Sequence, residues 1–336
     1  MKIQLRHRYD EVISVENLVL AWKEFAVGKG SKSDVQDFNG HLMDHIFALH
    51  ADLVKREYRH GGYESFFIHD PKRRHIHKAS VSDRVVHHAL YRACYQFFDR
   101  TFIADSFSCR NDKGPYKAID RFQRFARQVS RNRSRACWVL KCDIRKFFAS
   151  IDHGILLSIL ASHIPDNEIL ALFQNIVSSF ETTVGLQVGL PLGNLTSQLL
   201  ANVYMNRFDQ WVKHTLKATH YIRYADDFVF LSDEREVLEA ILARAGQFLL
   251  TDLKLSLHPK KVFLRTFASG VDFLGWVHFQ DHRLLRRTTR HRAFRRLKDH
   301  ATKETLQSYL GLLTHGATFK VEQDFKQLYW LWQSEF

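Results

Sequence analysis

The chain has 336 residues and a formal net charge of +13, from 49 Lys and Arg against 36 Asp and Glu. This length allows two or three lobes around a large core, and the basic balance indicates a polyanionic partner. There is no run of 18 apolar residues, the N-terminus lacks a signal-peptide core, and the four cysteines form no CxxC pair. We therefore expect a cytoplasmic protein with no membrane partner, no disulfides and no structural zinc.

Helices and strands are both predicted along the chain, without a regular alternation. Apolar residues at helical spacing predict helices over residues 11–60, 83–98, 118–131, 156–179, 199–217 and 235–250, and over most of the last 50 residues. Apolar and β-branched runs predict strands over residues 64–69, 137–142, 184–188, 221–231 and 271–279. This mixture favours an α+β fold.

The segment 221–231 carries two adjacent acids, Asp226 and Asp227, between two apolar runs. This pattern predicts a strand, a tight turn and a second strand, with both carboxylates at the turn. Two negative charges side by side at the tip of an apolar hairpin are unfavourable unless a cation lies beside them. Carboxylate oxygens are hard ligands, so magnesium is the expected ion, with manganese as the alternative.

A third acid, Asp143, ends the predicted strand 137–142. If this strand pairs beside the 221–231 hairpin, Asp143, Asp226 and Asp227 converge, and three carboxylates can hold two metal ions about 3.5–4 Å apart for phosphoryl transfer. A lone Asp-Asp pair is most often a solvated turn, and a lone Asp after a strand simply ends it. Their joint occurrence beside apolar strands favours the metal site.

Residues 283–298 form a basic segment without a single acid. A surface helix held by ion pairs would interleave acids, so this segment is expected to contact phosphates. Two histidine pairs, at 75 and 77 and at 87 and 88, are candidate metal ligands. No Cys or acid is spaced to complete a tetrahedral site with them, so contact with a polyanion or a helix surface is the favoured interpretation.

Several motifs together resemble the palm motifs of reverse transcriptases, in the same order and with similar spacing. They are Asp143-Ile144-x-x-Phe147-Phe148-x-x-Ile151-Asp152, Gly189-Leu190-Pro191-Leu192-Gly193-Asn194-Leu195-Thr196-Ser197-Gln198 and Tyr224-Ala225-Asp226-Asp227, with Pro71-Lys72-Arg73-Arg74-x-Ile76 upstream and Leu257-His258-Pro259-Lys260-Lys261 and Phe273-Leu274-Gly275-Trp276 downstream. The resemblance covers roughly residues 65–300. It implies a right-hand polymerase with an N-terminal helical region (1–64), fingers and a palm of antiparallel sheet and helices (65–282), and a short helical thumb (283–336).

The resemblance also implies roles for individual residues. Asp143, Asp226 and Asp227 would be catalytic and would hold two Mg²⁺ ions, with the carbonyl of Ile144 as a further ligand. Residues implied to bind the incoming deoxynucleoside triphosphate are Lys72, Arg74, Phe148, Leu192, Gly193 and Lys261, with Phe148 as the steric gate against a ribose 2′-OH. Residues implied to contact template or primer are Gln198, Phe273, Gly275, Arg286, Arg287, Arg290 and Arg295.

One motif departs from the commonest family pattern. Many relatives carry Gln at the position of Leu192 and Pro at the position of Gln198. The combination found here is similar to the reverse transcriptases of diversity-generating retroelements, which copy a template RNA with errors at adenines and pass the cDNA into a variable gene. That subtype implies template RNA, a cDNA or primer strand, deoxynucleotides and a small basic accessory protein as partners. A retron or phage-defence reverse transcriptase, and a catalytically inactive RNA-binding scaffold, stay open as alternatives.

Overall fold

The computed structural model describes residues 3–69 and 72–333, so Pro71 of the motif at 71–76 lies outside the described residues. The chain divides into two compact units, each built from segments distant in sequence. Unit 1 comprises Met1–Ala104, Ile144–Lys217 and Ala245–His258, and unit 2 comprises Asp105–Asp143, Ala218–Arg244 and Pro259–Phe336. The expected boundaries at 64/65 and 282/283 divide the chain differently and stay predictions.

Unit 1 is mainly helical. Its elements are α1 (Tyr9–Ile13), α2 (Val15–Ala26), α3 (Ser33–Gly40), α4 (Leu42–Val54), β1 (Tyr63–Ile68), β2 (Arg74–Ala79), α5 (Val81–Thr101), the short 3-10 helix η1 (Phe147–Ser150), α7 (His153–Ala161), α8 (Asn167–Ser178) and α9 (Leu195–His214). Helix α5 packs against both α2 and α9. Strands β1 and β2 form an antiparallel hairpin in which Phe66 lies opposite Ile76.

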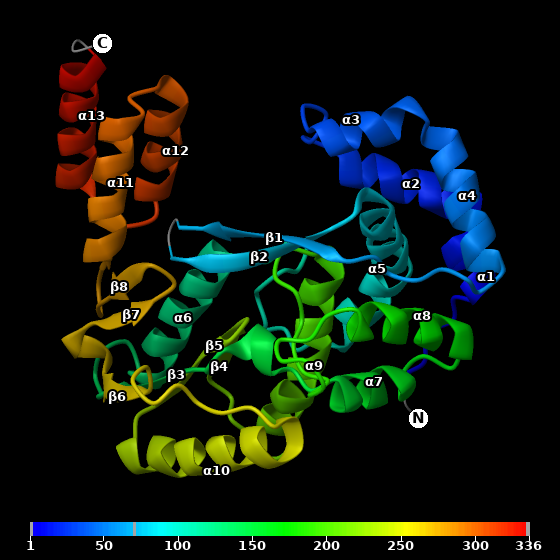
Figure 1. The fold of residues 1–336 in the computed structure, drawn as a ribbon. Coiled ribbons are helices and arrows are strands. Elements are labelled where there is room, and N and C mark those ends of the chain that lie inside the picture. The colour runs from blue at the N-terminus through cyan, green and yellow to red at the C-terminus, as the bar shows by residue number, and fades with distance from the viewer. Residues whose placement is uncertain (1–2, 70–71, 334–336) are drawn as a thin grey trace. The chain divides into compact units, whose positions relative to one another are not determined.

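Unit 2 is built on a four-stranded antiparallel sheet with the order β4-β5-β3-β6 (Figure 1). The strands are β3 (Trp138–Asp143), β4 (Tyr221–Tyr224), β5 (Asp227–Ser232) and β6 (Phe263–Thr266). Helix α6 (Pro115–Val129) packs on β4 and β5 and places Ile119, Phe122 and Phe125 in the core. Helix α10 (Arg235–Leu253) begins in unit 2 and ends in unit 1. Strand β3 is paired on both sides, with β5 and β6, and its residues after Trp138 are buried.

The rest of unit 2 is a small sheet followed by three helices. The sheet has the order β7-β8-β9, from Val271–Phe273, Trp276–His278 and Arg283–Leu285, and the helices are α11 (Arg287–Asp299), α12 (Lys303–Leu313) and α13 (Phe319–Gln333). The three helices pack together (Figure 1) around a core that contains Leu297, Leu313 and Phe325.

The α+β architecture of the sequence prediction is confirmed, with three local corrections. Residues 184–188 are not a strand: the chain turns at Val184 and Gly185, Gly185 and Gln187 have positive φ, Val184 is 94% exposed, and only Val188 forms an isolated bridge, with Asp152. Residues 271–279 form the β7–β8 hairpin instead of one strand, since Leu274 and Gly275 both have positive φ, as a type I′ turn requires. The basic segment 283–298 is a strand, β9, followed by α11.

Candidate active site

The acids predicted to form a site lie on neighbouring strands of the unit 2 sheet. Asp143, the last residue of β3, lies directly opposite Asp227, the first residue of β5. Residues directly opposite each other project from the same face of a sheet, so these carboxylates share one face. Asp226 occupies the two-residue turn between β4 and β5, which Tyr224 and Asp227 close as a cross-strand pair. The structure thus places all three acids at one end of the sheet.

The turn that carries Asp226 is held from inside unit 2 by Arg223. Ala225 has a φ of 55°, an uncommon value for a residue with a Cβ. The fully buried guanidinium of Arg223 donates to the carbonyl oxygen of Ala225 at 3.2 Å and to Oγ of Ser106 at 3.1 Å. Sequence inspection did not single out Arg223, although an arginine inside an apolar hairpin strand was the available signal.

Two lysines contact two of the three acids. Nζ of Lys261 donates to Oδ1 and Oδ2 of Asp143 at 2.9 and 3.1 Å. Nζ of Lys141 lies 2.9 Å from Oδ1 of Asp227, and the Lys141 side chain is only 10% exposed. Lys141 is two residues before Asp143 on β3, so both project from the same face of the sheet. The sequence analysis missed Lys141, whose signal was a lysine within an otherwise apolar buried strand.

The electrostatics of the cluster disfavour negative charge. Burial raises the pKa of the Asp226 carboxyl to about 6, and the nearby charges of Asp143 and Asp227 act in the same direction. Burial also raises the pKa of Asp227, against the opposing effect of the Lys141 ammonium. A cation added to this cluster would stabilise the ionised carboxylates.

Replacing Lys141 with methionine is expected to lower the free energy of unfolding by about 2 kcal/mol, because the charge-assisted contact with buried Asp227 is lost. Urea unfolding in the absence of divalent ions measures this. Lys320→Met, at an exposed position of α13, is the matched control and should change stability by less than about 0.5 kcal/mol. Equal stability of Lys141→Met and the control would show that Lys141 does not compensate Asp227.

The donor set fits a hard divalent cation. Three carboxylates supply only oxygen ligands, the ligand type that Mg²⁺ and Mn²⁺ prefer. Within residues 3–69 and 72–333, no three His, Cys, Asp or Glu side chains are already gathered closely enough to hold an ion. The ammonium groups of Lys261 and Lys141 contact two of the three acids instead, which shows that the cluster accepts positive charge at these oxygens.

Three of the residues expected to bind nucleotide are linked within unit 1. The half-buried Phe148 lies in η1, and its carbonyl oxygen accepts a hydrogen bond from the Leu190 N–H at 2.8 Å. The Leu192 carbonyl oxygen accepts from the His77 N–H of β2 at 2.9 Å. Gly193 has a φ of 112°, and a Cβ there would come within 2.8 Å of Ile76. A glycine is therefore required at 193, both for its backbone conformation and for the close approach of β2.

The other residues of unit 1 that are predicted to bind metal, nucleotide or template lie on the β1–β2 hairpin, directly after β3 and at the start of α9. Lys72 and Arg74 are exposed, and Arg74 is on the same face of β2 as Ile76, the residue against Gly193. Ile144 is buried and bridges to Leu257. Gln198 is exposed in the first turn of α9. Their roles in binding stay predictions.

The predicted primer contacts of unit 2 lie on its small sheet. The ring of Phe273 is fully buried and packs 5.2 Å from that of Phe122, so only its backbone is left for the predicted contact with primer. Gly275 forms the turn of the β7–β8 hairpin, and its carbonyl oxygen accepts from the Arg286 N–H at 3.0 Å. The Arg286 guanidinium is paired with Asp272.

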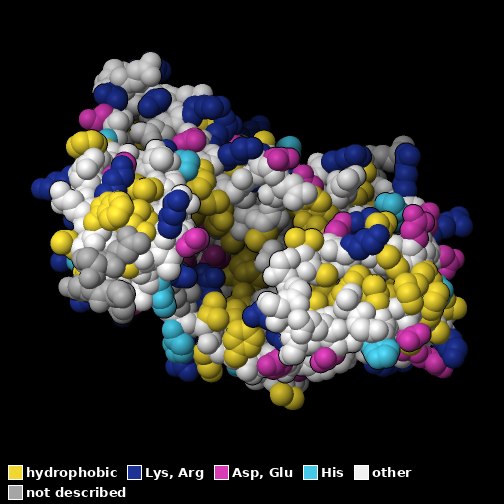
Figure 2. All heavy atoms as spheres, turned by 90° about the horizontal axis from the view of Figure 1, so that it is seen from above, with side chains coloured by type: hydrophobic (Ala, Val, Ile, Leu, Met, Phe, Trp, Pro, Cys, Tyr) yellow, Lys and Arg dark blue, Asp and Glu magenta, His cyan; other side chains and the backbone are white. Residues whose placement is uncertain are grey.

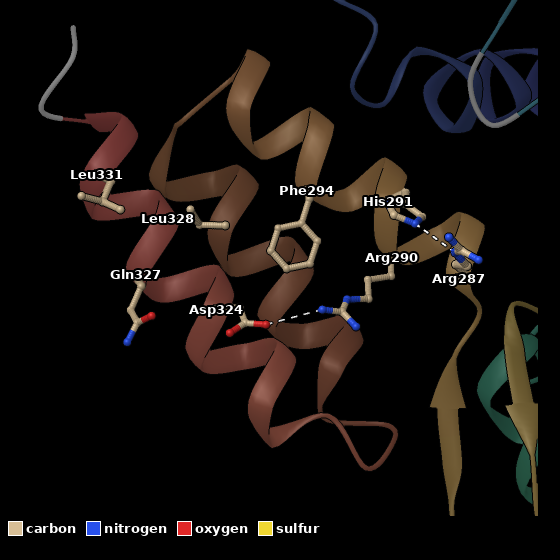
Figure 3. Close-up of a pocket in the computed structure, with 8 residues that line it drawn as sticks. All are labelled: Arg287, Arg290, His291, Phe294, Asp324, Gln327, Leu328 and Leu331. Atoms are coloured by element: carbon tan, nitrogen blue, oxygen red, sulfur yellow. Dashed lines mark hydrogen bonds and ion pairs between the residues drawn. The ribbon is translucent and has the colours of Figure 1, made fainter.

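The predicted thumb arginines project from α11 (Figure 3). Arg290 lies 3.5 Å from Asp324 of α13, and Nε of Arg287 lies 3.3 Å from Nε2 of His291. These residues and Phe294 line a pocket of about 670 Å³ between α11 and α13. Arg295 is exposed. Basic side chains interleaved with aromatic ones are typical of a nucleic-acid surface.

Basic and hydrophobic side chains also lie side by side on the molecular surface. Lys and Arg side chains are spread over the face seen in Figure 2, with patches of hydrophobic side chains among them. Exposed aromatic residues include Phe66, Phe67 and Trp330. In unit 1, the Arg73 guanidinium lies 4.1 Å from the ring centroid of Phe67, which also stacks on His75.

Comparison with known proteins identifies the family. The sequence model described as reverse transcriptase (RNA-dependent DNA polymerase) matches residues 69–278, more than half of the chain. The chain belongs to the reverse transcriptase family. The match spans β2, β3, the β4–β5 hairpin and the three acids.

The curated relatives of this reverse transcriptase come from bacteria and yeasts. It is similar to "Protein YkfC" of Escherichia coli, with 24% identity over 76% of this chain and 77% of the relative. It is also similar to an uncharacterized 91 kDa protein in the cob intron of Schizosaccharomyces pombe, with 24% identity over 40% of the chain, and to a putative COX1/OXI3 intron 2 protein of Saccharomyces cerevisiae, with 19% identity over 41%. These alignments span 16% and 23% of the two yeast proteins.

Membership in this family establishes the class of reaction. The chain is an RNA-directed DNA polymerase, a nucleotidyltransferase that binds a nucleic-acid template and deoxynucleoside triphosphates. Reverse transcriptases generally use Mg²⁺. Among residues 3–69 and 72–333, no helix combines the length and the hydropathy that a membrane span requires.

Proposed function

We propose that Asp143, Asp226 and Asp227 are the catalytic acids of this polymerase and hold two divalent ions. The observation that supports this is the cross-strand pairing of Asp143 with Asp227, with Asp226 in the adjoining turn. When bound, such ions activate the attacking 3′-hydroxyl and neutralise the triphosphate. Ile144 follows Asp143 directly, and we assign its carbonyl as a further ligand.

The chain's own residues would prepare this site in two ways. Arg223 fixes the turn through the carbonyl of Ala225, so Asp226 is held in place before substrate binds. Lys141 and Lys261 compensate the carboxylates when no divalent ion is present. Lys261 is 43% exposed, so its ammonium can move from Asp143 to the leaving pyrophosphate, the role that we assign to it. Lys141 is nearly buried and would stay at Asp227.

We further propose that this enzyme is the mutagenic polymerase of a diversity-generating retroelement. Support comes from Leu192, at a position where many relatives carry Gln, and from Gln198 in place of Pro. The half-buried Leu192 is fixed to β2 through its backbone, so its side chain cannot withdraw easily. The partners in this proposal are a template RNA, a cDNA or primer strand and a small basic accessory protein. The cytoplasm is the proposed compartment, in keeping with the four free thiols.

The physical reason for low fidelity is the loss of a polar contact. A glutamine amide at position 192 can hydrogen-bond the incoming nucleotide and test its pairing geometry, whereas leucine has no donor or acceptor. The loss of one such hydrogen bond corresponds to about 1 kcal/mol, or roughly fivefold in discrimination. We propose that this weakens selection opposite template adenine.

Leu192→Gln is expected to lower misincorporation opposite template adenine by about fivefold. The measurement is deep sequencing of cDNA made by purified enzyme on an RNA template that contains all four bases. Leu186→Gln, at a 62% exposed position of the neighbouring turn, is the matched control and should leave the error spectrum unchanged. Unchanged adenine errors in Leu192→Gln would remove Leu192 from the proposal.

The same sequencing separates the alternative functions. Wild-type errors concentrated at template adenines support the retroelement role, whereas a uniform low error rate would favour a retron or phage-defence enzyme. Primer extension with Mg²⁺ on an RNA template separates a polymerase from a scaffold. Extension by the wild type and not by Asp226→Asn supports the catalytic role of the acids, and extension by neither would favour an RNA-binding scaffold.

A further inference from the structure

A chain of buried polar side chains runs through the interior of unit 1. The side chain of His60 is fully buried, and its Nε2 lies 3.0 Å from Nε2 of His87 on α5. On the other side of the His87 ring, Nδ1 lies 3.3 Å from Oγ1 of Thr196, in the first turn of α9. His87 and Thr196 are each only 1% exposed. Both ring nitrogens of His87 are thus engaged inside the protein.

The far end of this chain sets the direction of its hydrogen bonds. The Gly61 carbonyl oxygen, 2.6 Å from Nδ1 of His60, can only accept, so this nitrogen donates. Nε2 of a neutral His60 then accepts from the Nε2–H of His87. Burial lowers the pKa of His87 well below its usual range, so its ring is neutral near pH 7. Its Nδ1 is therefore left to accept from the Thr196 hydroxyl.

The His60 end of the chain is fixed to the helical core by Asp83, which is also on α5. The buried Asp83 carboxylate accepts from the hydroxyls of Tyr58 and Ser80, each at 2.7 Å, and from the Gly61 N–H at 3.2 Å. Helix α5 itself packs against both α2 and α9. The polar chain therefore connects the first turn of α9 to the helical core of unit 1.

Thr196 follows closely on the loop that is proposed to bind the incoming nucleotide. That loop is also held by β2, where the Leu192 carbonyl oxygen accepts from the His77 N–H and Nδ2 of Asn194 donates to the His77 carbonyl oxygen, both at 2.9 Å. However, β2 belongs to a hairpin of two strands, and such a hairpin is marginally stable by itself. The His87 contact ties the same segment to a long, packed helix instead.

We propose that His87 is a positioning residue, which holds the loop at 192–194 in its nucleotide-binding conformation through the Thr196 hydroxyl. The proposal rests on the proposed role of that loop in binding the incoming deoxynucleotide, and it is independent of the mutagenic role. Without the hydrogen bond, the loop would occupy its binding conformation for a smaller fraction of the time, and the apparent affinity for nucleotide falls by that fraction. Saturating nucleotide selects the same conformation again, so the maximal rate should be retained.

Thr196→Val is expected to raise the half-saturating deoxynucleotide concentration about fivefold and to keep the maximal rate within about twofold, because it removes one hydrogen bond and retains the shape of the side chain. Single-turnover primer extension with Mg²⁺ on an RNA template, over a range of deoxynucleotide concentrations, measures both quantities. Thr196→Ser keeps the hydroxyl and should restore the wild-type value. Thr251→Val is the matched control, because Thr251 is exposed on α10 and its hydroxyl contacts the Gln247 carbonyl of the same helix.

His87→Gln provides an independent variant. A glutamine amide can keep the contact with His60 from the position of Nε2, but it leaves no acceptor at the position of Nδ1. It should raise the half-saturating concentration by a similar factor, and the double variant with Thr196→Val should be no worse than either single variant. Additive effects in the double variant would show that His87 and Thr196 act separately, and they would overturn the proposal.

An unchanged half-saturating concentration in Thr196→Val would also overturn it, as would a lower maximal rate alone. Leu192→Ala, in the same assay, identifies the cause of such a result. If Leu192→Ala raises the half-saturating concentration and Thr196→Val does not, the loop binds nucleotide but His87 does not position it. If neither variant changes it, the proposed role of the loop fails together with this inference. Urea unfolding of each variant confirms that extension is measured on folded protein.

Discussion

Asp226→Asn is expected to reduce Mg²⁺-dependent primer extension at least about a thousandfold, equivalent to ~4 kcal/mol of activation free energy. The substitution keeps the size and shape of the side chain but removes the charge of one of the three carboxylates proposed to hold the ions. It should act on the rate of nucleotide addition and leave the affinity for primer–template largely unchanged. Single-turnover extension on an RNA template measures the rate, and anisotropy with the same duplex measures affinity.

The same variant is expected to be more stable than the wild type when divalent ions are absent. Asp226 is disfavoured as an anion by its burial and by the neighbouring Asp143 and Asp227. A neutral amide removes this repulsion, so the melting temperature in EDTA should rise by roughly 2 °C. Asp233→Asn is the control for both measurements. Asp233 directly follows β5 and forms an exposed ion pair with Arg135. Extension by Asp226→Asn within tenfold of the wild-type rate would contradict the assigned role.

Arg223→Met is expected to lower the free energy of unfolding by about 3 kcal/mol, the second largest effect. The guanidinium is fully buried, and its loss leaves the Ala225 carbonyl and the Ser106 hydroxyl without their donor. Because Ala225 adjoins Asp226, extension should also fall by more than the fraction of unfolded protein explains. Urea unfolding, and extension well below the melting temperature of the variant, separate the two effects.

Arg235→Met is the matched control for this prediction. Arg235 is exposed and pairs with Glu239 one turn along α10 at 2.9 Å, so its loss should change stability by no more than about 0.5 kcal/mol. If Arg223→Met unfolded at the same urea concentration as Arg235→Met, the Arg223 contacts would not be what holds the turn.

The arrangement of the acids could be predicted from sequence because the signals are local. The apolar runs on both sides of Asp226 and Asp227 predicted the hairpin, and the apolar strand before Asp143 predicted its position at a strand end. The structure pairs β3 with β5 on one side and with β6 on the other. The sequence alone does not show the register between β3 and β5. In the structure, Asp143 lies opposite Asp227.

Other features depend on tertiary contacts that no local pattern shows. Lys141 and Arg223 are buried charged residues. Their partners are distant in sequence, because Lys141 contacts Asp227 and Arg223 contacts Ser106. The apolar alternation of Val184, Leu186 and Val188 predicted a strand, yet the first two are exposed because the chain turns at Gly185.

A crystal structure with Mn²⁺, primer–template and a non-hydrolysable deoxynucleotide tests the proposed two-metal site most directly. Anomalous scattering should place two ions within ligand distance of the carboxylates of Asp143, Asp226 and Asp227, with the Lys261 ammonium no longer on Asp143. Anomalous peaks that avoid these three carboxylates, while nucleotide is bound elsewhere on the enzyme, would contradict the proposal.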